Sequence, residues 1–180
     1  MRLILVRHPQ PDVATGICYG RTDLAASEAE IARVQAELAR AGLPGQLPVY
    51  ASPLVRCAAL ARRVCDMPRF DARLAEMDFG AWEMRSWDDI PRDEVDAWSA
   101  DLLHCRPGGG ESVIDVAARV AAFRADLALG GNAQAMVICH AGTMRLLASL
   151  HAGGTPQEAA LRAAQAPHRI GYGEVLVLKD

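Results

Sequence analysis

The chain begins MRLILVRHPQP (residues 1–11), an apolar run that ends in a cation, an imidazole and a proline. Residues 3–6 have the length and composition of a strand that is buried on both faces of a parallel sheet. Arg7 and His8 follow at its carboxyl end, and Pro9 stops the strand because proline lacks a backbone donor and fixes φ. The stretch therefore predicts a core strand with two polar side chains at its tip, where the proline turns the chain away.

Strand and helix signals alternate along the rest of the chain. Further strands are expected at residues 47–51, 69–74, 135–139 and 174–178. Helix starts are expected at the capping box of Ser27 and Glu30, at Ser52-Pro53, near 86–89, after the glycine loop 108–110, after His140 and at Thr155. This alternation predicts an α/β fold, a three-layer α/β/α arrangement with a mostly parallel central sheet. No repeat or long linker interrupts it, so we expect one domain over residues 1–180.

The bulk properties exclude several classes of partner. The net charge of −3 provides no general attraction to nucleic acid or to an anionic membrane. No apolar run approaches the roughly 20 residues of a membrane span, and the N-terminal run is too short for a signal peptide. We therefore expect a cytoplasmic protein that binds neither nucleic acid nor membrane. The oligomeric state is left open.

The cysteines and two of the histidines give no functional signal. The five cysteines are scattered and contain no C-x-x-C pair, which fits neither a disulfide framework nor a structural zinc site. We expect them to be reduced and mostly buried. His151 and His168 are expected to be structural.

Polar residues follow three of the expected strands. Arg7 and His8 follow the first strand, Arg56 lies in the first turn of the helix after the second, and His140 follows the strand at 135–139. Parallel strands bring their carboxyl ends to one edge of a sheet, where ligands bind. Two arginines beside helix N-termini would form an anion site. With two imidazoles, the pattern points to a phosphate ester, which one histidine attacks while the other donates to a phosphate oxygen.

Each of these residues taken alone has a simpler explanation. A lone histidine after a strand is more often structural than catalytic. Arg56 alone would be a solvated charge that opposes the helix dipole by roughly 0.3–1 kcal/mol, a cost that a bound phosphate would reverse. The convergence of three strand ends carries the prediction.

Four segments together resemble one known family. They are LVRHP (5–9), SPLVRC (52–57), EMDFGAWE (76–83) and ICHAG (138–142), in this order along the chain. They are similar to the histidine phosphatase superfamily, also called phosphoglycerate-mutase-like, over about residues 3–147. FGAWE (79–83) and PGGGES (107–112) look most like the alpha-ribazole phosphatase branch. The resemblance implies a phosphoglycerate-mutase-like fold and phosphate-ester chemistry.

The resemblance also implies a role for each site residue. His8 would attack phosphorus as neutral imidazole, form a phosphohistidine, and bind phosphate together with Arg7, Arg56 and His140. Glu76 would protonate the leaving oxygen and then take a proton from water. Flanking arginines would favour the neutral nucleophile by lowering its pKa. No metal or other cofactor is required, because the arginines supply the positive charge.

Other residues have open assignments. Asp78 and Glu83 are alternatives to Glu76 as the acid, and a surface carboxylate without a role is the simpler explanation for each. Arg21 matches a family segment that lines the substrate entrance, and a solvated arginine in a turn is the alternative. The glycines at 108–110 lack the G-K-[ST] ending of a P-loop and are expected to form a flexible loop near the pocket rim, with Ser112 or Glu111 capping the next helix.

Three positions depart from the family pattern. The family usually has glycine where Pro9 stands, and the proline removes any phosphate contact from that amide. Residues 25–27 replace the usual threonine and glycine before the first long helix, and Met84 replaces a frequent glycine. Since the nucleophile and both arginines are present, we expect these changes to alter the shape of the pocket and to leave the chemistry intact.

The leading functional hypothesis is a metal-independent phosphomonoester hydrolase that acts on a small phosphorylated metabolite, with alpha-ribazole 5′-phosphate in cobalamin biosynthesis as the candidate from branch resemblance. The alternatives are a phosphoglycerate mutase and a non-catalytic protein of this fold that binds phosphate or phosphopeptides. A metal hydrolase using His8, Asp12, Glu76 and His140 is a further alternative, although the sequence has no H-E-x-x-H or similar spacing.

Overall fold

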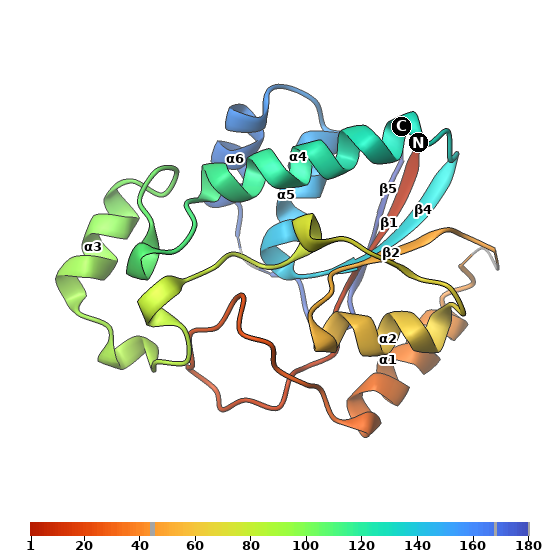
Figure 1. Ribbon diagram of the computed structural model, residues 1–180, viewed down its shortest axis with the longest axis horizontal. Coiled ribbons are helices and arrows are strands. Elements are labelled where there is room, and N and C mark those ends of the chain that lie inside the picture. Colours follow the sequence, from red (N-terminus) through yellow and green to blue (C-terminus); the bar gives the residue numbers. More distant parts are fainter. Residues whose placement is uncertain (44–45, 168, 180) are drawn as a thin grey trace.

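A five-stranded sheet forms the centre of the molecule in the computed structural model, which describes residues 1–43, 46–167 and 169–179. His168 lies outside the described residues. Helices cover both faces of the sheet (Figure 1), so the predicted three-layer α/β/α architecture is confirmed. None of the helices in these ranges is long and apolar enough to cross a membrane.

The strands have the order β3-β2-β4-β1-β5 in the sheet. Their bounds are β1 (Arg2–Arg7), β2 (Val49–Ala51), β3 (Arg69–Phe70), β4 (Gln134–Cys139) and β5 (Val175–Leu178). β1 to β4 are parallel, and β5 runs antiparallel to β1 at one edge. In the register, Arg7 pairs with Cys139 and Ala51 pairs with Ile138, so three strands end side by side at one edge of the sheet.

The helices divide between the two faces of the sheet. α1 (Glu28–Arg40) and α2 (Val55–Val64) share one core with the inward residues Ile4 and Val6 of β1. α4 (Val113–Leu129), α5 (Ala141–His151) and α6 (Pro156–Gln165) pack against the other face, where Leu3 and Leu5 point. β1 is therefore apolar at every interior position because both of its faces are covered.

Most helix starts follow the predicted capping residues. The side chains of Ser27, Ser112 and Thr155 each accept a hydrogen bond from the backbone three residues on, and Ser112 forms a full capping box with Asp115. The predicted start at Ser52-Pro53 is wrong, since α2 begins at Val55 after Leu54. The Ser52 hydroxyl lies 2.8 Å from His140 Nε2, so it serves a tertiary contact in addition to accepting from the Leu54 amide.

Two other predicted elements differ from the structure. The strand predicted over 69–74 ends at Phe70, because Asp71 accepts from the Arg73 amide and starts the 3₁₀ helix η1 (Ala72–Leu74). The helix start at 86–89 is a single 3₁₀ turn, η3 (Trp87–Asp89), and α3 (Arg92–Ala100) begins after Pro91.

Residues 79–112 form a separate lobe beside the sheet, seen at the left of Figure 1 around α3. It contains η2 (Gly80–Trp82) and η4 (Pro107–Gly109), and its centre is a cluster of aromatic rings. A Cβ on Gly80 would lie 2.2 Å from the Gly108 oxygen, so the two turns pack backbone to backbone. The predicted flexible loop at 108–110 is therefore wrong for Gly108 and Gly110, whose backbones pack closely on residues 78–82 and support the lobe.

Met84 has φ of +64°, in the left-handed region that favours glycine. This conformation explains why a glycine suits the position and shows that the methionine keeps the backbone turn. All five cysteines are free, and Cys18, Cys57 and Cys139 are buried as expected.

Candidate active site

One cavity of about 450 Å³ lies at the carboxyl ends of β1 and β4. The residues around it include five that the sequence singled out as catalytic: Arg7, His8, Arg56, Glu76 and His140. The structure therefore brings the residues at the three strand ends together around one cavity, as the sequence predicts. Each side chain is positioned by a different local interaction.

His8 is buried, with 2% of its surface exposed, and its backbone amide donates to the Cys139 carbonyl across the end of the sheet. Its Nδ1 lies 2.7 Å from the Pro9 carbonyl oxygen. Because a carbonyl only accepts, Nδ1 carries the proton and Nε2 keeps its lone pair. Burial, then the charge of Arg56 and that of Arg7, lower the pKa of His8 to about 3 against the opposing effect of the Pro9 hydrogen bond. His8 is neutral at physiological pH.

Arg7 is held by the segment before β5. Its guanidinium lies 3.9 Å from the centre of the Tyr172 ring and donates to the Ile170 carbonyl. The Tyr172 hydroxyl is 2.7 Å from the Tyr19 hydroxyl, which ties the two loops on this side of the cavity together. Tyr172 also lies near His8, at 5.6 Å between ring centres, so it packs against both residues at the tip of β1.

Arg56 is fully buried at the first turn of α2. Its two terminal nitrogens donate to the carbonyls of Thr22 and Gly20, at 2.8 and 2.6 Å. The loop at 20–22 therefore fixes the direction of the guanidinium. This contact also satisfies part of the buried charge, which would otherwise be costly.

Glu83 organises that loop. Its carboxylate accepts from the amides of Gly20, Arg21 and Thr22, from the Thr22 hydroxyl and from the Phe79 amide. Burial alone would raise the pKa of Glu83, but the hydrogen bonds outweigh it and lower that pKa. Glu83 does not line the cavity, so as the alternative acid it is less suited than Glu76.

Asp78 and Arg21 lie beside one another outside the cavity. Asp78 accepts from the Gly80 amide at 2.8 Å, and its other oxygen lies 3.9 Å from the guanidinium of Arg21. Half of the Arg21 side chain is exposed. Neither residue lines the cavity, so the geometry does not bring Arg21 to the substrate entrance that the family segment implied.

His140 is the N-cap residue of α5 and is completely buried. Its ring centre lies 5.0 Å from that of His8. Burial comes first, then the repulsion that His8 would exert if both rings were protonated, and then the charge of Arg56; together they hold the pKa of His140 well below its usual value. The two imidazoles are therefore neighbours that are both neutral near pH 7.

Glu76 lines the same cavity as the two imidazoles, and its carboxylate lies at the start of α5. Its Oε2 accepts from the Gly142 amide at 3.0 Å, and its Oε1 accepts from the Met77 amide at 3.1 Å. A Cβ on residue 142 would lie 2.5 Å from Oε1, so the glycine of the H-A-G segment makes room for the carboxylate. A helix N-terminus stabilises a carboxylate at this place.

Sequence reasoning missed the apolar wall of the cavity and one arginine. The wall contains Phe79, Trp87 and Trp98, which come from the lobe at 79–112. Arg145 lines the cavity from α5 and donates to the carbonyls of Ala163 and Ala166 at the end of α6. Its spacing of four residues from Ala141 places both on one helix face, and that spacing was a usable signal.

Residues 1–43, 46–167 and 169–179 contain no group of three or more His, Cys, Asp or Glu side chains that could hold a metal ion. The ligand set of the metal-hydrolase alternative is therefore not assembled in this part of the chain.

Comparison with known proteins agrees with the architecture. The model of the histidine phosphatase superfamily (branch 1) matches residues 3–172. The comparison with curated proteins found no significant match.

Three solved structures illustrate the similarity. The alpha-ribazole phosphatase from Shigella flexneri has a TM-score of 0.82 at 26% identity, over 99% of this chain and 90% of that chain. The mycobacterial glucosyl-3-phosphoglycerate phosphatase has a TM-score of 0.74 at 27% identity, over 89% and 83%. The phosphoglycerate mutase from Thermus thermophilus has a TM-score of 0.72 at 28% identity, over 99% and 92%. With a family match over most of its length and this shared fold, the chain belongs to the histidine phosphatase superfamily, branch 1.

Proposed function

We propose that this chain, acting as one cytoplasmic domain, is a metal-independent phosphomonoester hydrolase with His8 as its nucleophile. The observation that carries the proposal is the state of His8, which is buried beside two arginines and has a pKa lowered to about 3. Its Nδ1 is bonded to the Pro9 carbonyl, so Nε2 is left as a free nucleophile in the cavity. The Pro9 carbonyl fixes the orientation of the His8 ring. The missing N–H of proline does not affect this contact, because the contact uses the carbonyl.

The reaction divides into two displacements. In the first, His8 Nε2 forms a bond to phosphorus while the ester oxygen leaves with a proton from Glu76. In the second, water attacks the phosphohistidine, Glu76 takes the water's proton, and the P–N bond breaks to release inorganic phosphate. Arg7, Arg56 and His140 surround the transferring group and offset its developing charge.

The apolar wall supports a substrate whose leaving group carries a planar ring. Trp87 and Trp98 are nearly parallel, with an interplanar angle of 14°, and both face the cavity that contains His8. A phosphate ester of a ring-bearing nucleoside-like alcohol fits this division into a charged end and an aromatic end. Alpha-ribazole 5′-phosphate has this chemistry and is our specific candidate, supported further by similarity to the Shigella flexneri enzyme.

The first experiment measures hydrolysis of p-nitrophenyl phosphate with EDTA present, for the wild type and His8→Ala. We expect wild-type turnover, a loss of at least about 10³-fold in kcat for His8→Ala, and covalent labelling of the wild type as an acid-labile phosphohistidine. His104→Ala is the matched control, because His104 is exposed and pairs with Asp101 on the surface.

Turnover that survives His8→Ala, or that stops with EDTA, would contradict the mechanism. Wild type without turnover on p-nitrophenyl phosphate and on alpha-ribazole 5′-phosphate would contradict the hydrolase itself and favour a binding protein. Activity only with added bisphosphoglycerate would favour the mutase.

A further inference from the structure

The proposed acid Glu76 lies on a segment with no regular structure of its own. η1 ends at Leu74 and η2 begins at Gly80, so residues 75–79 belong to no helix or strand. A carboxylate that exchanges protons with a leaving group must nevertheless be held to within about 1 Å. Something other than secondary structure has to fix this backbone.

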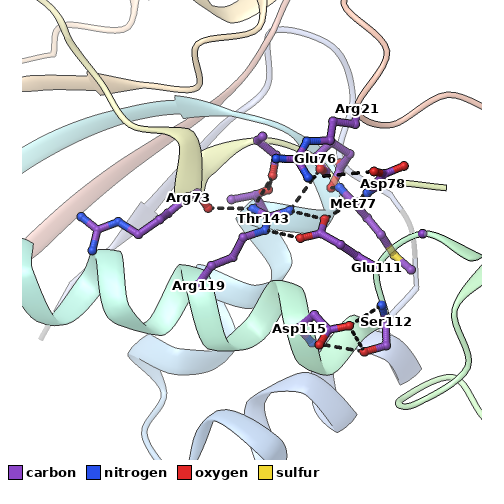
Figure 2. Close-up of polar contacts among 12 residues, drawn as sticks. Arg21, Arg73, Glu76, Met77, Asp78, Glu111, Ser112, Asp115, Arg119 and Thr143 are labelled. Carbon is purple, nitrogen blue, oxygen red and sulfur yellow. Dashed lines mark hydrogen bonds and ion pairs between the residues drawn. The ribbon is translucent and has the colours of Figure 1, made fainter. Parts of the chain in front are cut away.

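Arg119 of α4 fixes this backbone by donating hydrogen bonds to its carbonyl groups, as Figure 2 shows. One terminal nitrogen donates to the carbonyls of Arg73 and Ala75, both at 2.7 Å. The other donates to the Glu76 carbonyl at 3.1 Å and to Glu111 at 2.9 Å, and Nε also donates to Glu111 at 2.9 Å. A guanidinium has five N–H donors, and here all five are used.

Glu111 completes the arrangement from the other side. Its Oε2 accepts from the Asp78 amide at 3.1 Å, and its own amide donates to the Asp78 carbonyl at 2.8 Å. Burial alone would raise the pKa of Glu111, but the hydrogen bonds and charge of Arg119 outweigh it and lower that pKa. Both side chains of the pair are only 17% exposed.

A second helix fixes the opposite side of the segment. Thr143 of α5 donates from Oγ1 to the Ala75 carbonyl at 3.1 Å, and the Gly142 amide binds the Glu76 carboxylate. The backbone of the segment is therefore bonded to two long helices that pack on the same face of the sheet.

We propose that Arg119 and Glu111 are a positioning pair that sets the Glu76 carboxylate for proton transfer; this inference rests on the proposed function. Neither residue lines the cavity, so neither contacts substrate. The pair acts through the backbone of residues 73–78, which it holds at both ends. Its contribution is specific to the steps in which Glu76 moves a proton.

Leaving groups of different basicity test this specificity. A p-nitrophenolate ion departs without a proton, whereas an alkoxide needs one, so general-acid catalysis matters chiefly for alkyl phosphates. For Arg119→Gln we expect kcat on an alkyl phosphate to fall roughly 10- to 100-fold. On p-nitrophenyl phosphate, we expect the rate constant of phosphoryl transfer to His8, followed as the burst of p-nitrophenol, to fall less than about threefold. An equal loss in both substrates would overturn the proposal.

Two further variants separate position from charge and from general damage. Arg119→Lys keeps the positive charge, which also acts on His140, but cannot make five directed bonds. We expect it to show the loss of Arg119→Gln, and full activity in the lysine variant would overturn the proposal. Arg92→Gln is the matched control, because its guanidinium pairs with Asp96 on the exposed face of α3, and we expect kcat to stay within about twofold.

The double variant with Glu76→Gln gives a second test. If Arg119 acts only by placing Glu76, Arg119→Gln adds less than about twofold to the loss already caused by Glu76→Gln on the alkyl ester. Fully multiplicative losses would mean that Arg119 has a separate structural role and would overturn the proposal.

Hydrogen exchange tests the pair without reference to activity. We expect Arg119→Gln to speed amide exchange in the peptide covering residues 75–79 by about tenfold or more, with exchange in β1 and β4 unchanged. Unchanged exchange in 75–79 would overturn the positioning pair even in an active enzyme. Accelerated exchange in a protein whose wild type hydrolyses no phosphomonoester would instead overturn the proposed function and leave the hold on this backbone supported.

Discussion

Two walls of the same cavity are built in different ways. The strand-end wall consists of Arg7, His8, Arg56 and His140, which lie at the ends of β1 and β4 and at the start of α2. The aromatic wall consists of Phe79, Trp87 and Trp98, which lie in the lobe at 79–112. The first wall follows from sheet register, whereas the second depends on ring packing and on turns that touch backbone to backbone.

The difference indicates a division of labour. The strand-end wall is cationic, and its residues His8, Arg56 and His140 are buried, so it suits the phosphoryl group that every phosphate ester shares. The aromatic wall has no sheet behind it. It is placed to contact the leaving group, which differs from one ester to another. Changes in the first wall should affect all substrates alike, and changes in the second should affect substrates selectively.

Among the changes that test this comparison of the two walls, Arg56→Lys should have the largest effect. A lysine keeps the charge but cannot bond to both the Gly20 and the Thr22 carbonyls while also gripping phosphate. We expect kcat/KM to fall by about 10²–10³-fold for an aryl and an alkyl phosphate alike. Steady-state kinetics on both esters measures this.

Arg33→Lys serves as the control for that change, because Arg33 pairs with Glu30 and Glu37 on the exposed face of α1. A loss confined to one of the two esters would contradict the distinction between the two walls, since it would mean that Arg56 interacts with the leaving group. Thermal unfolding of both variants checks that the fold is intact.

The strand-end wall could be predicted from sequence because its information is local and periodic. An apolar run that ends in Arg7-His8 and another that ends in His140 each mark a strand tip, and parallel register then brings the tips together. Glu76 was reached only through family resemblance, because it lies on an irregular segment that side chains of α4 and α5 hold.

The aromatic wall could not be predicted because nothing periodic defines it. Trp87 and Trp98 lie in a 3₁₀ turn and a short helix, and their partners are set by the contact of Gly80 with Gly108 across the lobe. Such a contact depends on long-range packing that no local spacing encodes. For the same reason, the sequence at 108–110 predicts a loop, whereas the structure has the 3₁₀ turn η4 over Pro107–Gly109.

The next expected effect is on the pH dependence of the stability of the fold, and it arises from the histidines of the strand-end wall. The pKa of His8 is about 3 in the folded chain and about 6.5 when unfolded, so between these values the unfolded chain binds more protons. Stability should therefore fall as pH is lowered from 6.5 towards 3, and His8 contributes about 2 kcal/mol of that loss by pH 5. His140 acts in the same direction.

Urea unfolding at pH 7 and pH 5 measures this loss for the wild type and for His8→Asn, whose amide can still donate to the Pro9 carbonyl. We expect the variant to lose less stability on acidification than the wild type does. Identical pH dependence in His8→Asn and the wild type would mean that His8 is protonated in the folded chain near pH 5.

The smallest effect should come from Trp98→Leu, which tests the aromatic wall. The leucine keeps an apolar surface but loses the ring that stacks on Trp87 and packs edge to face on Phe79. An aromatic pair contributes about 0.5–1.5 kcal/mol beyond buried area, so KM for an aryl phosphate should rise roughly threefold to tenfold. KM for a small alkyl phosphate should stay within about twofold, because that ester leaves the wall unoccupied.

Phe70→Leu provides the matched aromatic control, since Phe70 lies on β3 away from the cavity and is 41% exposed. Equal KM changes for the two esters in Trp98→Leu would mean that the lobe shapes the whole cavity, and the division between the walls would fail. A change confined to the aryl ester would instead make the lobe the place where substrate choice can be altered without touching His8. In that case the same strand-end chemistry can serve different metabolites through substitutions in residues 79–112 alone.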